Sequence, residues 1–226
     1  MSLACETCPV RDSAACAVLS DAERRALSAA GRTRILERGE TLFAAGDTNA
    51  ACATLISGAL KISSTDIDGN ERILALVHPS GFVGEMFSPF AHYDVIALTG
   101  SELCTFAKTD LANALEIYPA LARALLRRSQ EDLHASRELI EMSGKNSAKD
   151  TVGTFLLALA SAASASPCHP ADQFDIPLSR GDMANMLGLT IETVSRQITG
   201  FEKAGAIRRK GGRRIELLDP ALLTRD

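Results

Sequence analysis

Cysteines are the residues best suited to chemistry near the start of this chain. Cys5, Cys8 and Cys16 form a C-x2-C-x7-C array, with Pro9 after the second cysteine. Thiolates bind soft metals and iron–sulfur clusters, so this array favours a metal or redox site over structural disulfides. Cys5 and Cys8 can reach two irons of one cluster through a two-residue turn, and Cys16 closes the loop. Zinc is the alternative, although zinc sites seldom leave a seven-residue gap between ligands.

A second group of chemically useful side chains lies near the other end of the chain. Glu192, Ser195 and Arg196 are expected on the outer face of a helix. Arg196 has the fork geometry to bind O6 and N7 of guanine, Glu192 can accept from cytosine N4, and Ser195 can contact thymine. These three side chains are therefore predicted to read DNA bases. The opposite face of the same helix carries a stripe at helical spacing, Val194, Ile198 and Phe201.

The stretch Leu178 to Ile207 contains the elements that would position these side chains. A first short helix carries Met183, Ala184 and Leu187, and Gly188 ends it. Thr190 is a good N-cap for the second helix. Two short helices with a glycine turn and polar side chains early in the second form a helix-turn-helix pattern. An ordinary helical hairpin is the alternative interpretation.

A basic hairpin follows the second helix. Strands are expected at Ile207 and Ile215–Leu217, with Gly211-Gly212 supplying the positive φ angles of a tight turn. The chain's net charge is -4, but the stretch from Arg180 to Arg214 contains eight Lys or Arg and only three acidic residues. The pattern indicates a winged helix-turn-helix whose cations contact phosphate. The predicted phosphate contacts are Arg180, Thr190, Lys203, Arg208, Arg209, Lys210, Arg213 and Arg214.

The middle of the chain is expected to hold a β domain and a long helix. Short β runs with intervening glycines extend from Thr33 to Phe106, which is typical of a compact barrel or roll. A helix is expected from Pro119 to about Met142, with a seven-residue repeat along one face. That repeat predicts a parallel two-stranded interface between subunits, or packing onto the β domain. The residues of the stripe are Leu126, Ser129, Leu133, Ser136 and Ile140.

These elements predict an α+β protein with four segments. They are a cysteine-rich N-terminus (1–19), a β-roll sensory domain (20–118), a dimerisation helix (119–143) and a winged helix-turn-helix domain (144–226). No apolar run approaches the roughly 20 residues of a membrane span, and the start lacks the order of a signal peptide. A cytoplasmic protein is expected. No nucleophile–base arrangement or phosphate-cradling glycine loop is present in the sequence, so an enzyme is not expected.

Several stretches resemble the Crp–Fnr transcription regulators over nearly the whole chain. FAAGDTNAACATLISGALKIS (Phe43 to Ser63) and GFVGEMF (Gly81 to Phe87) look like the β-roll of that family. ETVSR (Glu192 to Arg196) is similar to the recognition signature of its Fnr branch. The cysteine array, together with Cys104 in SELC, resembles the cluster ligands of that branch.

The resemblance implies a ligand set, a DNA site and partners. It implies that Cys104 joins Cys5, Cys8 and Cys16 around a 4Fe–4S cluster. The residues themselves leave Cys52 and Cys168 open as alternative fourth ligands. It also implies a homodimer on a palindrome of TTGAT half-sites. The same resemblance implies contact with RNA polymerase through the tip Asp66, Asp68 and Asn70.

Other ligands of this superfamily find little support in the sequence. The segment after Gly84-Glu85 is MFSPFAHYDV and contains no arginine to pair with a nucleotide phosphate. Cyclic nucleotide binding is therefore not expected, and Glu85 is interpreted as structural. A haem would have only His78 and His92 in the roll, and both are interpreted as surface or turn residues.

The resulting hypothesis is an oxygen-responsive transcription regulator that binds DNA while it carries its cluster. One alternative is a cluster-free Crp–Fnr regulator gated by a small effector or by thiol redox chemistry. Another, from a different class, is an iron–sulfur electron carrier.

Overall fold

The computed structural model describes residues 5–144, 147–164, 166 and 168–224, so the predicted segments 1–19 and 144–226 lie partly outside it. The chain divides into two compact units, 1–135 and 136–226, and each is described by itself. The division falls inside a helix, between Ala135 and Ser136. No helix among the described residues has the length and apolar character needed to cross a bilayer.

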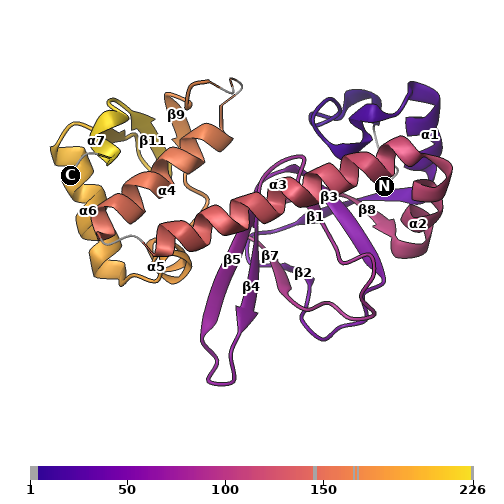
Figure 1. Cartoon of the computed structure of the whole chain (residues 1–226), viewed down its shortest axis with the longest axis horizontal. Coiled ribbons are helices and arrows are strands. Elements are labelled where there is room, and N and C mark those ends of the chain that lie inside the picture. The colour runs from indigo at the N-terminus through magenta and orange to yellow at the C-terminus, as the bar shows by residue number, and fades with distance from the viewer. Residues whose placement is uncertain (1–4, 145–146, 165, 167, 225–226) are drawn as a thin grey trace. The chain divides into compact units, whose positions relative to one another are not determined.

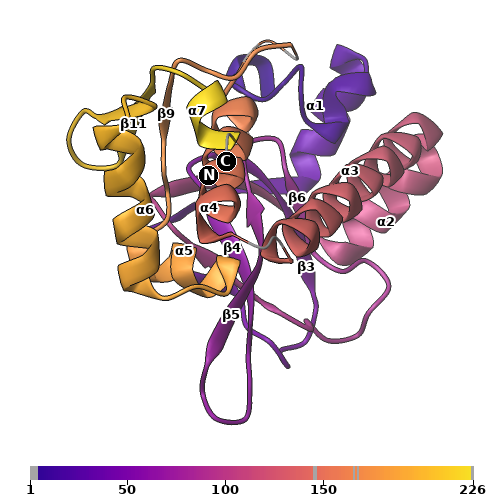
Figure 2. The same cartoon turned by 60° about the vertical axis from the view of Figure 1, so that its left-hand side comes forward.

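In the described residues, the first unit holds two four-stranded antiparallel sheets, ordered β1-β8-β3-β6 and β2-β7-β4-β5. Leu55, Leu60 and Leu103 are fully buried in the core that these strands share. The β-roll is confirmed, and its β4–β5 hairpin projects from the unit (Figure 1, Figure 2). The strands are β1 (Gly31–Leu36), β2 (Thr41–Phe43), β3 (Ala51–Ser57), β4 (Leu60–Thr65), β5 (Glu71–Val77), β6 (Phe82–Val83), β7 (Asp94–Ala97) and β8 (Ser101–Ala107).

Strand β8 is an inner strand of the β1-β8-β3-β6 sheet. It pairs with β1 on one side and β3 on the other. Leu103 is buried in the roll core, whereas Phe106 is buried in a second apolar cluster outside it. Because both faces of β8 are partly covered, its sequence lacks the alternation of a half-exposed strand.

Short helices cover the outer face of the β1-β8-β3-β6 sheet. Leu27 and Leu111 come from them and pack in one cluster with Leu19, Phe106 and Cys52. Ser20 forms a capping box with Glu23 at the start of α1. This layer consists of η1 (Cys5–Thr7), η2 (Ala15–Val18), α1 (Asp21–Ala30) and α2 (Lys108–Ile117).

The long helix α3 runs from Pro119 to Ser143. Leu126, Leu133 and Ile140 are 63%, 50% and 74% exposed in the single chain. Within the first unit, Leu126 and Leu133 of the stripe predicted at seven-residue spacing are therefore open to solvent and do not pack onto the β-roll.

The second unit contains the helix-turn-helix and a small sheet. α4 packs closely on α7, because a Cβ added at Gly153 would lie 2.0 Å from the carbonyl oxygen of Leu223. The antiparallel sheet has the order β10-β11-β9. Its third strand, β9, was not expected, since only Phe174 of its three residues is buried. The elements are α4 (Ala148–Ala162), β9 (Gln173–Asp175), α5 (Arg180–Leu187), α6 (Ile191–Lys203), β10 (Ile207–Arg209), β11 (Arg214–Leu217) and α7 (Ala221–Thr224).

Candidate functional site

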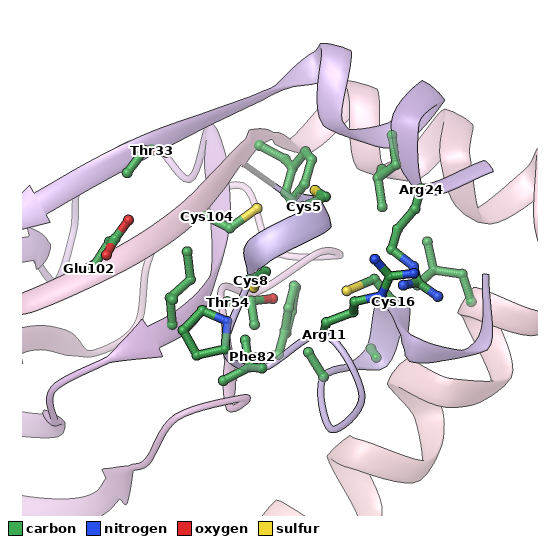
Figure 3. A pocket seen from close by; sticks show the side chains of 18 of the residues that line it. Cys5, Cys8, Arg11, Cys16, Arg24, Thr33, Thr54, Phe82, Glu102 and Cys104 are labelled. Atoms are coloured by element: carbon green, nitrogen blue, oxygen red, sulfur yellow. The ribbon is translucent and has the colours of Figure 1, made fainter. Parts of the chain in front are cut away.

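Four cysteines line one cavity of about 320 Å³ in the first unit (Figure 3). Cys5 lies in η1, Cys8 follows it in a turn, Cys16 lies in η2 and Cys104 lies on β8. The structure therefore brings together the whole ligand set that the resemblance implies. Three members come from one short segment, and the fourth comes from a strand 88 positions after Cys16.

Cross-strand register places Cys104 in this cavity. It lies opposite Thr33 of β1 and Thr54 of β3, and both threonines also line the cavity. Glu102 and Phe106, two positions away on either side, line it too, because alternate residues of a strand share a face. The strand β8 thus holds the cysteine on the sheet face that the N-terminal segment covers.

The two alternative fourth ligands have different surroundings. Cys52 is only 1% exposed, and its Sγ lies 3.7 Å from the carbonyl oxygen of Phe106 within the apolar cluster under α2. Cys168 is exposed and belongs to the second unit, whereas the cavity is lined by residues of the first. Cys52 thus packs in the same apolar cluster as Cys104 but does not line the cavity, and Cys168 lies in the other unit.

The N-terminal segment is held over the sheet by local bonds and apolar contacts. The amide of Ala14 donates to the carbonyl oxygen of Val10 at 2.9 Å, and that of Leu19 to Cys16 at 3.2 Å. Val10 and Ala14 are buried against Ile56 of β3. These contacts anchor the cysteine segment on the β-roll.

Burial makes three of the cavity thiols weaker acids than a solvent-exposed cysteine. It raises the pKa of Cys5, Cys16 and Cys104, and neighbouring cysteines of the cavity raise each pKa further. The positive charge of Arg24 opposes the rise at Cys5 and Cys16. Among the described residues, no three His, Cys, Asp or Glu side chains converge as they would around a single metal ion.

The helix-turn-helix in the second unit is built from local signals. Ser179 and Asp182 form a capping box at α5, and Gly188 ends that helix with φ 67°. The hydroxyl of Thr190 accepts from the amide of Thr193 at 3.2 Å and caps α6. The predicted N-cap is therefore confirmed.

The predicted base-reading side chains lie on the outer side of α6. Glu192 and Arg196 are exposed and Ser195 is half-buried. The stripe of Val194, Ile198 and Phe201 is buried, as predicted. The helix therefore has one anchored face and one open polar face.

Acidic side chains lie beside several cations of the predicted wing, so their positive charge is smaller than the number of Lys and Arg in the sequence indicates. Arg208 and Lys210 lie 2.8 and 3.1 Å from Glu216, and Arg214 lies 3.4 Å from Asp175. These two acids lie outside the stretch Arg180 to Arg214 that was counted. Strand pairing brings them beside the cations, because β11 lies between β10 and β9.

The remaining predicted phosphate contacts differ in how open they are. Arg209 lies 2.5 Å from Glu202 of α6, and Arg213 donates to the carbonyl oxygen of Pro177. Arg180 is half-buried, with Nη1 3.5 Å from Met183 Sδ, and burial lowers its pKa. Lys203, at the end of α6, is exposed.

Comparison with known proteins shows which protein family this chain is related to. Residues 33–118 match a cyclic nucleotide-binding domain model, and residues 152–225 match a Crp-like helix-turn-helix domain model. The chain is 31% identical to the transcriptional activator protein FnrL of Cereibacter sphaeroides over 97% of its length and 90% of that protein. It is 33% identical to the nitrogen fixation regulation protein FixK of Bradyrhizobium diazoefficiens, over 96% of this chain and 91% of that protein. The chain belongs to the Crp–Fnr family.

The fold agrees with solved structures of such regulators. FixK2 from Bradyrhizobium japonicum aligns with a TM-score of 0.76 at 23% identity, covering 85% of this chain and 95% of that one. Because several relatives of this Crp–Fnr protein are named transcriptional activators, the predictions of a transcription regulator and of a chain without enzymatic activity are confirmed.

Glu85 of this Crp–Fnr chain is held by contacts inside its own unit. The Glu85 carboxylate accepts from the backbone amide of His92 at 3.0 Å and contacts the His92 ring. The side-chain amide of Asn49 donates to the carbonyl oxygens of Glu85 and Ser88. These bonds agree with a structural role for Glu85. Of the two histidines weighed for haem, His92 is exposed, and burial lowers the pKa of His78.

The β4–β5 tip of this Crp–Fnr protein has a fixed shape. Asp66 Oδ1 accepts from the amides of Asp68 and Asn70 at 2.9 and 2.8 Å. Hydrogen bonds from the backbone and side chain of Asn70 are the main cause of the lowered pKa of Asp66. Ile67 between them is fully exposed. The tip is thus a rigid acidic turn with an open apolar side chain.

Proposed function

We propose that this chain is an oxygen-responsive, sequence-specific transcription regulator that acts in the cytoplasm as a homodimer. It binds DNA when it holds a 4Fe–4S cluster and loses DNA binding when oxygen destroys the cluster. The observation that carries the proposal is that four cysteines line one cavity: Cys5, Cys8, Cys16 and Cys104.

The residues around the cavity fit such a group. A 4Fe–4S cluster takes four thiolate ligands, and each binds a different iron, so the thiols must surround a space rather than meet at a point. The cavity provides that space, and Arg24 supplies buried N–H groups that lack an acceptor among the described residues. Metal binding must displace the protons of these thiols, so assembly should be favoured by higher pH.

When bound, the cluster would supply an oxygen-labile centre whose presence cross-links the N-terminal segment to β8. The chain's own residues determine what that cross-link holds. Cys5, Cys8 and Cys16 anchor the segment from one side, and Cys104 anchors it to the sheet. Without the cross-link, the segment keeps only contacts such as those of Val10 and Ala14 with Ile56.

Two exposed helix faces, the apolar stripe of α3 and the polar face of α6, would serve dimerisation and DNA reading. The open stripe of Leu126, Leu133 and Ile140 would pair with the same stripe of a second chain. Arg196 and Glu192 would read the central G·C pair of each TTGAT half-site. Twofold symmetry would place two such helices about 34 Å apart on a palindrome.

Activation would use the tip of the β4–β5 hairpin. Its rigid turn of Asp66, Asp68 and Asn70 would contact RNA polymerase in the DNA-bound dimer. The names of the relatives FnrL and FixK, an activator and a regulator of nitrogen fixation, favour a role in transcriptional activation.

The test is purification under nitrogen, followed by iron and sulfide assays and DNA binding before and after exposure to air. We expect about four irons per chain, and binding to a TTGAT palindrome that air abolishes. Cys104→Ser should lose the iron, whereas the matched variant Cys168→Ser should keep it. An iron-free wild-type protein whose DNA affinity ignores oxygen would favour the cluster-free alternative and overturn the proposal.

A further inference from the structure

Arg24 is a buried cation whose hydrogen-bonding capacity is only partly used. It lies in the second turn of α1, is 9% exposed and lines the cysteine cavity. Its Nη2 donates to the carbonyl oxygen of Leu19 at 2.6 Å. Within the described part of the chain, Nε and Nη1 have no hydrogen-bond acceptor. A buried guanidinium normally has partners for its donors, so these two free N–H groups require an explanation.

The nearest acid does not provide that partner. Asp21 Oδ1 lies 3.7 Å from Arg24 Nη1, beyond hydrogen-bonding distance. The same oxygen is 2.5 Å from Nη2 of Arg11, which therefore takes most of its accepting capacity. Asp21 is also largely exposed, so water screens its charge. The positive charge of Arg24 is left without a close, buried counter-charge.

The direction of the side chain identifies where an acceptor would lie. Figure 3 shows Arg24 reaching from α1 toward Cys16 at the cavity. Arg24 lines the same cavity as Cys5 and Cys16, so the guanidinium shares this space with two of the proposed ligands. A group bound among the four cysteines would therefore lie next to the positive charge of Arg24, which is shielded from water.

We propose that Arg24 is a positioning and charge-compensating residue of the cysteine site, whose free Nε and Nη1 donate to the anionic sulfur atoms of the bound iron–sulfur group. The inference rests on the function proposed above. Four thiolates around such a cluster carry excess negative charge, and hydrogen bonds to the sulfur atoms and net charge set its reduction potential. Bonds from a charged donor are stronger than neutral ones, especially where water is excluded. Arg24 thereby retains the cluster and raises its reduction potential.

The experiment compares anaerobically reconstituted full-length wild type with three variants. Arg24→Met removes the charge and the donors at similar length, and Arg24→Lys keeps the charge without the fork. The control Arg25→Met removes the same charge from the exposed neighbouring residue. The measurements are iron and sulfide per chain, the rate of iron loss to a chelator without oxygen, and the midpoint potential by spectroelectrochemistry.

Arg24→Met should lose iron roughly tenfold faster than wild type, the effect of losing a charge-assisted hydrogen bond. Its midpoint potential should be more negative, because the lost cation stabilised the more negative, reduced form. Arg24→Lys should restore part of both effects, and Arg25→Met should match wild type.

Thermal unfolding of the iron-free proteins measures the structural part of the role of Arg24. Arg24→Met also removes the Nη2 bond to the carbonyl oxygen of Leu19, so its iron-free form should unfold at a lower temperature than wild type. A purely structural residue would leave the midpoint potential of the loaded protein unchanged, so the potential separates the two roles. Wild-type potential and iron retention in Arg24→Met would overturn the inference alone. A wild-type chain that assembles no cluster would overturn both this inference and the proposed function.

Discussion

Nη2 of Arg128 donates to the carbonyl oxygen of Ser13 at 3.0 Å, and this bond ties α3 to the segment between Cys8 and Cys16. The same nitrogen lies 3.1 Å from Ser80 Oγ, so one guanidinium joins the helix, the cysteine segment and a roll loop. Arg128 lies two positions after Leu126 of the exposed stripe. A change in the cysteine segment therefore has a direct physical route to the proposed dimer helix.

Breaking this bond should loosen the cysteine segment. We expect Arg128→Met to lower the free energy of unfolding of the first unit by about 1–3 kcal/mol, the usual effect of losing a charged hydrogen bond. Amide hydrogen exchange of residues 10–19 should accelerate in the iron-free protein. The matched control is Arg127→Met, whose side chain is largely exposed and contacts Glu131. Equal exchange in both variants would show that the Ser13 bond does not anchor the segment.

The stripe on α3 should control the association of subunits. Leu133→Glu would place two carboxylates face to face in a parallel pair, and we expect dimer dissociation to rise at least about tenfold because a charge would be desolvated. Folding of the single chain should be retained, since Leu133 is half exposed there. Sedimentation velocity measures the shift. The neighbouring exposed substitution Gln130→Glu serves as the control, and a Leu133→Glu dimer of unchanged stability would exclude the stripe as the interface.

Arg196 and Lys203 should affect DNA binding in different ways. Arg196→Ala should weaken binding to the palindrome by about 1–3 kcal/mol for each half-site, roughly 5- to 150-fold per half-site, and relax preference at one base pair of each half-site. Lys203→Ala should weaken binding to all sequences alike and reduce the salt slope by about 1 for each subunit. Fluorescence anisotropy with the palindrome and with single-base variants at several salt concentrations distinguishes the two. A uniform loss in Arg196→Ala would remove it from the base-reading set.

The buried thiol of Cys52 should make the iron-free protein sensitive to alkaline pH. Burial raises its pKa from 9.0 to about 12 in the folded chain. Above pH 9 the unfolded chain loses this proton while the folded chain keeps it, so stability should fall between pH 9 and 12. Urea unfolding at pH 7 to 10.5 measures this fall. Cys52→Ala should flatten the slope and Cys168→Ala should not. If stability falls equally steeply with pH in both variants, the loss of stability at alkaline pH comes from groups other than Cys52.

Local sequence determined the DNA-binding end of this protein. Gly188 at the turn, the Thr190 cap and the buried stripe on α6 depend on neighbours within a few residues. Hydrogen bonds and side-chain contacts of a helix join residues three or four apart, so their signals are readable along the chain. The same holds for α1 and for the open stripe of α3.

Tertiary structure decided which residues share a site. Cys104 meets Cys16 only because β8 pairs with β1 and β3, and β8 has no clear alternation since both of its faces are covered. Likewise, Glu216 and Asp175 neutralise wing cations because three short strands pair. The free donors of Arg24 depend on burial and on Arg11 binding Asp21. Cross-strand register and burial join residues far apart in sequence, and no periodicity along the chain records them.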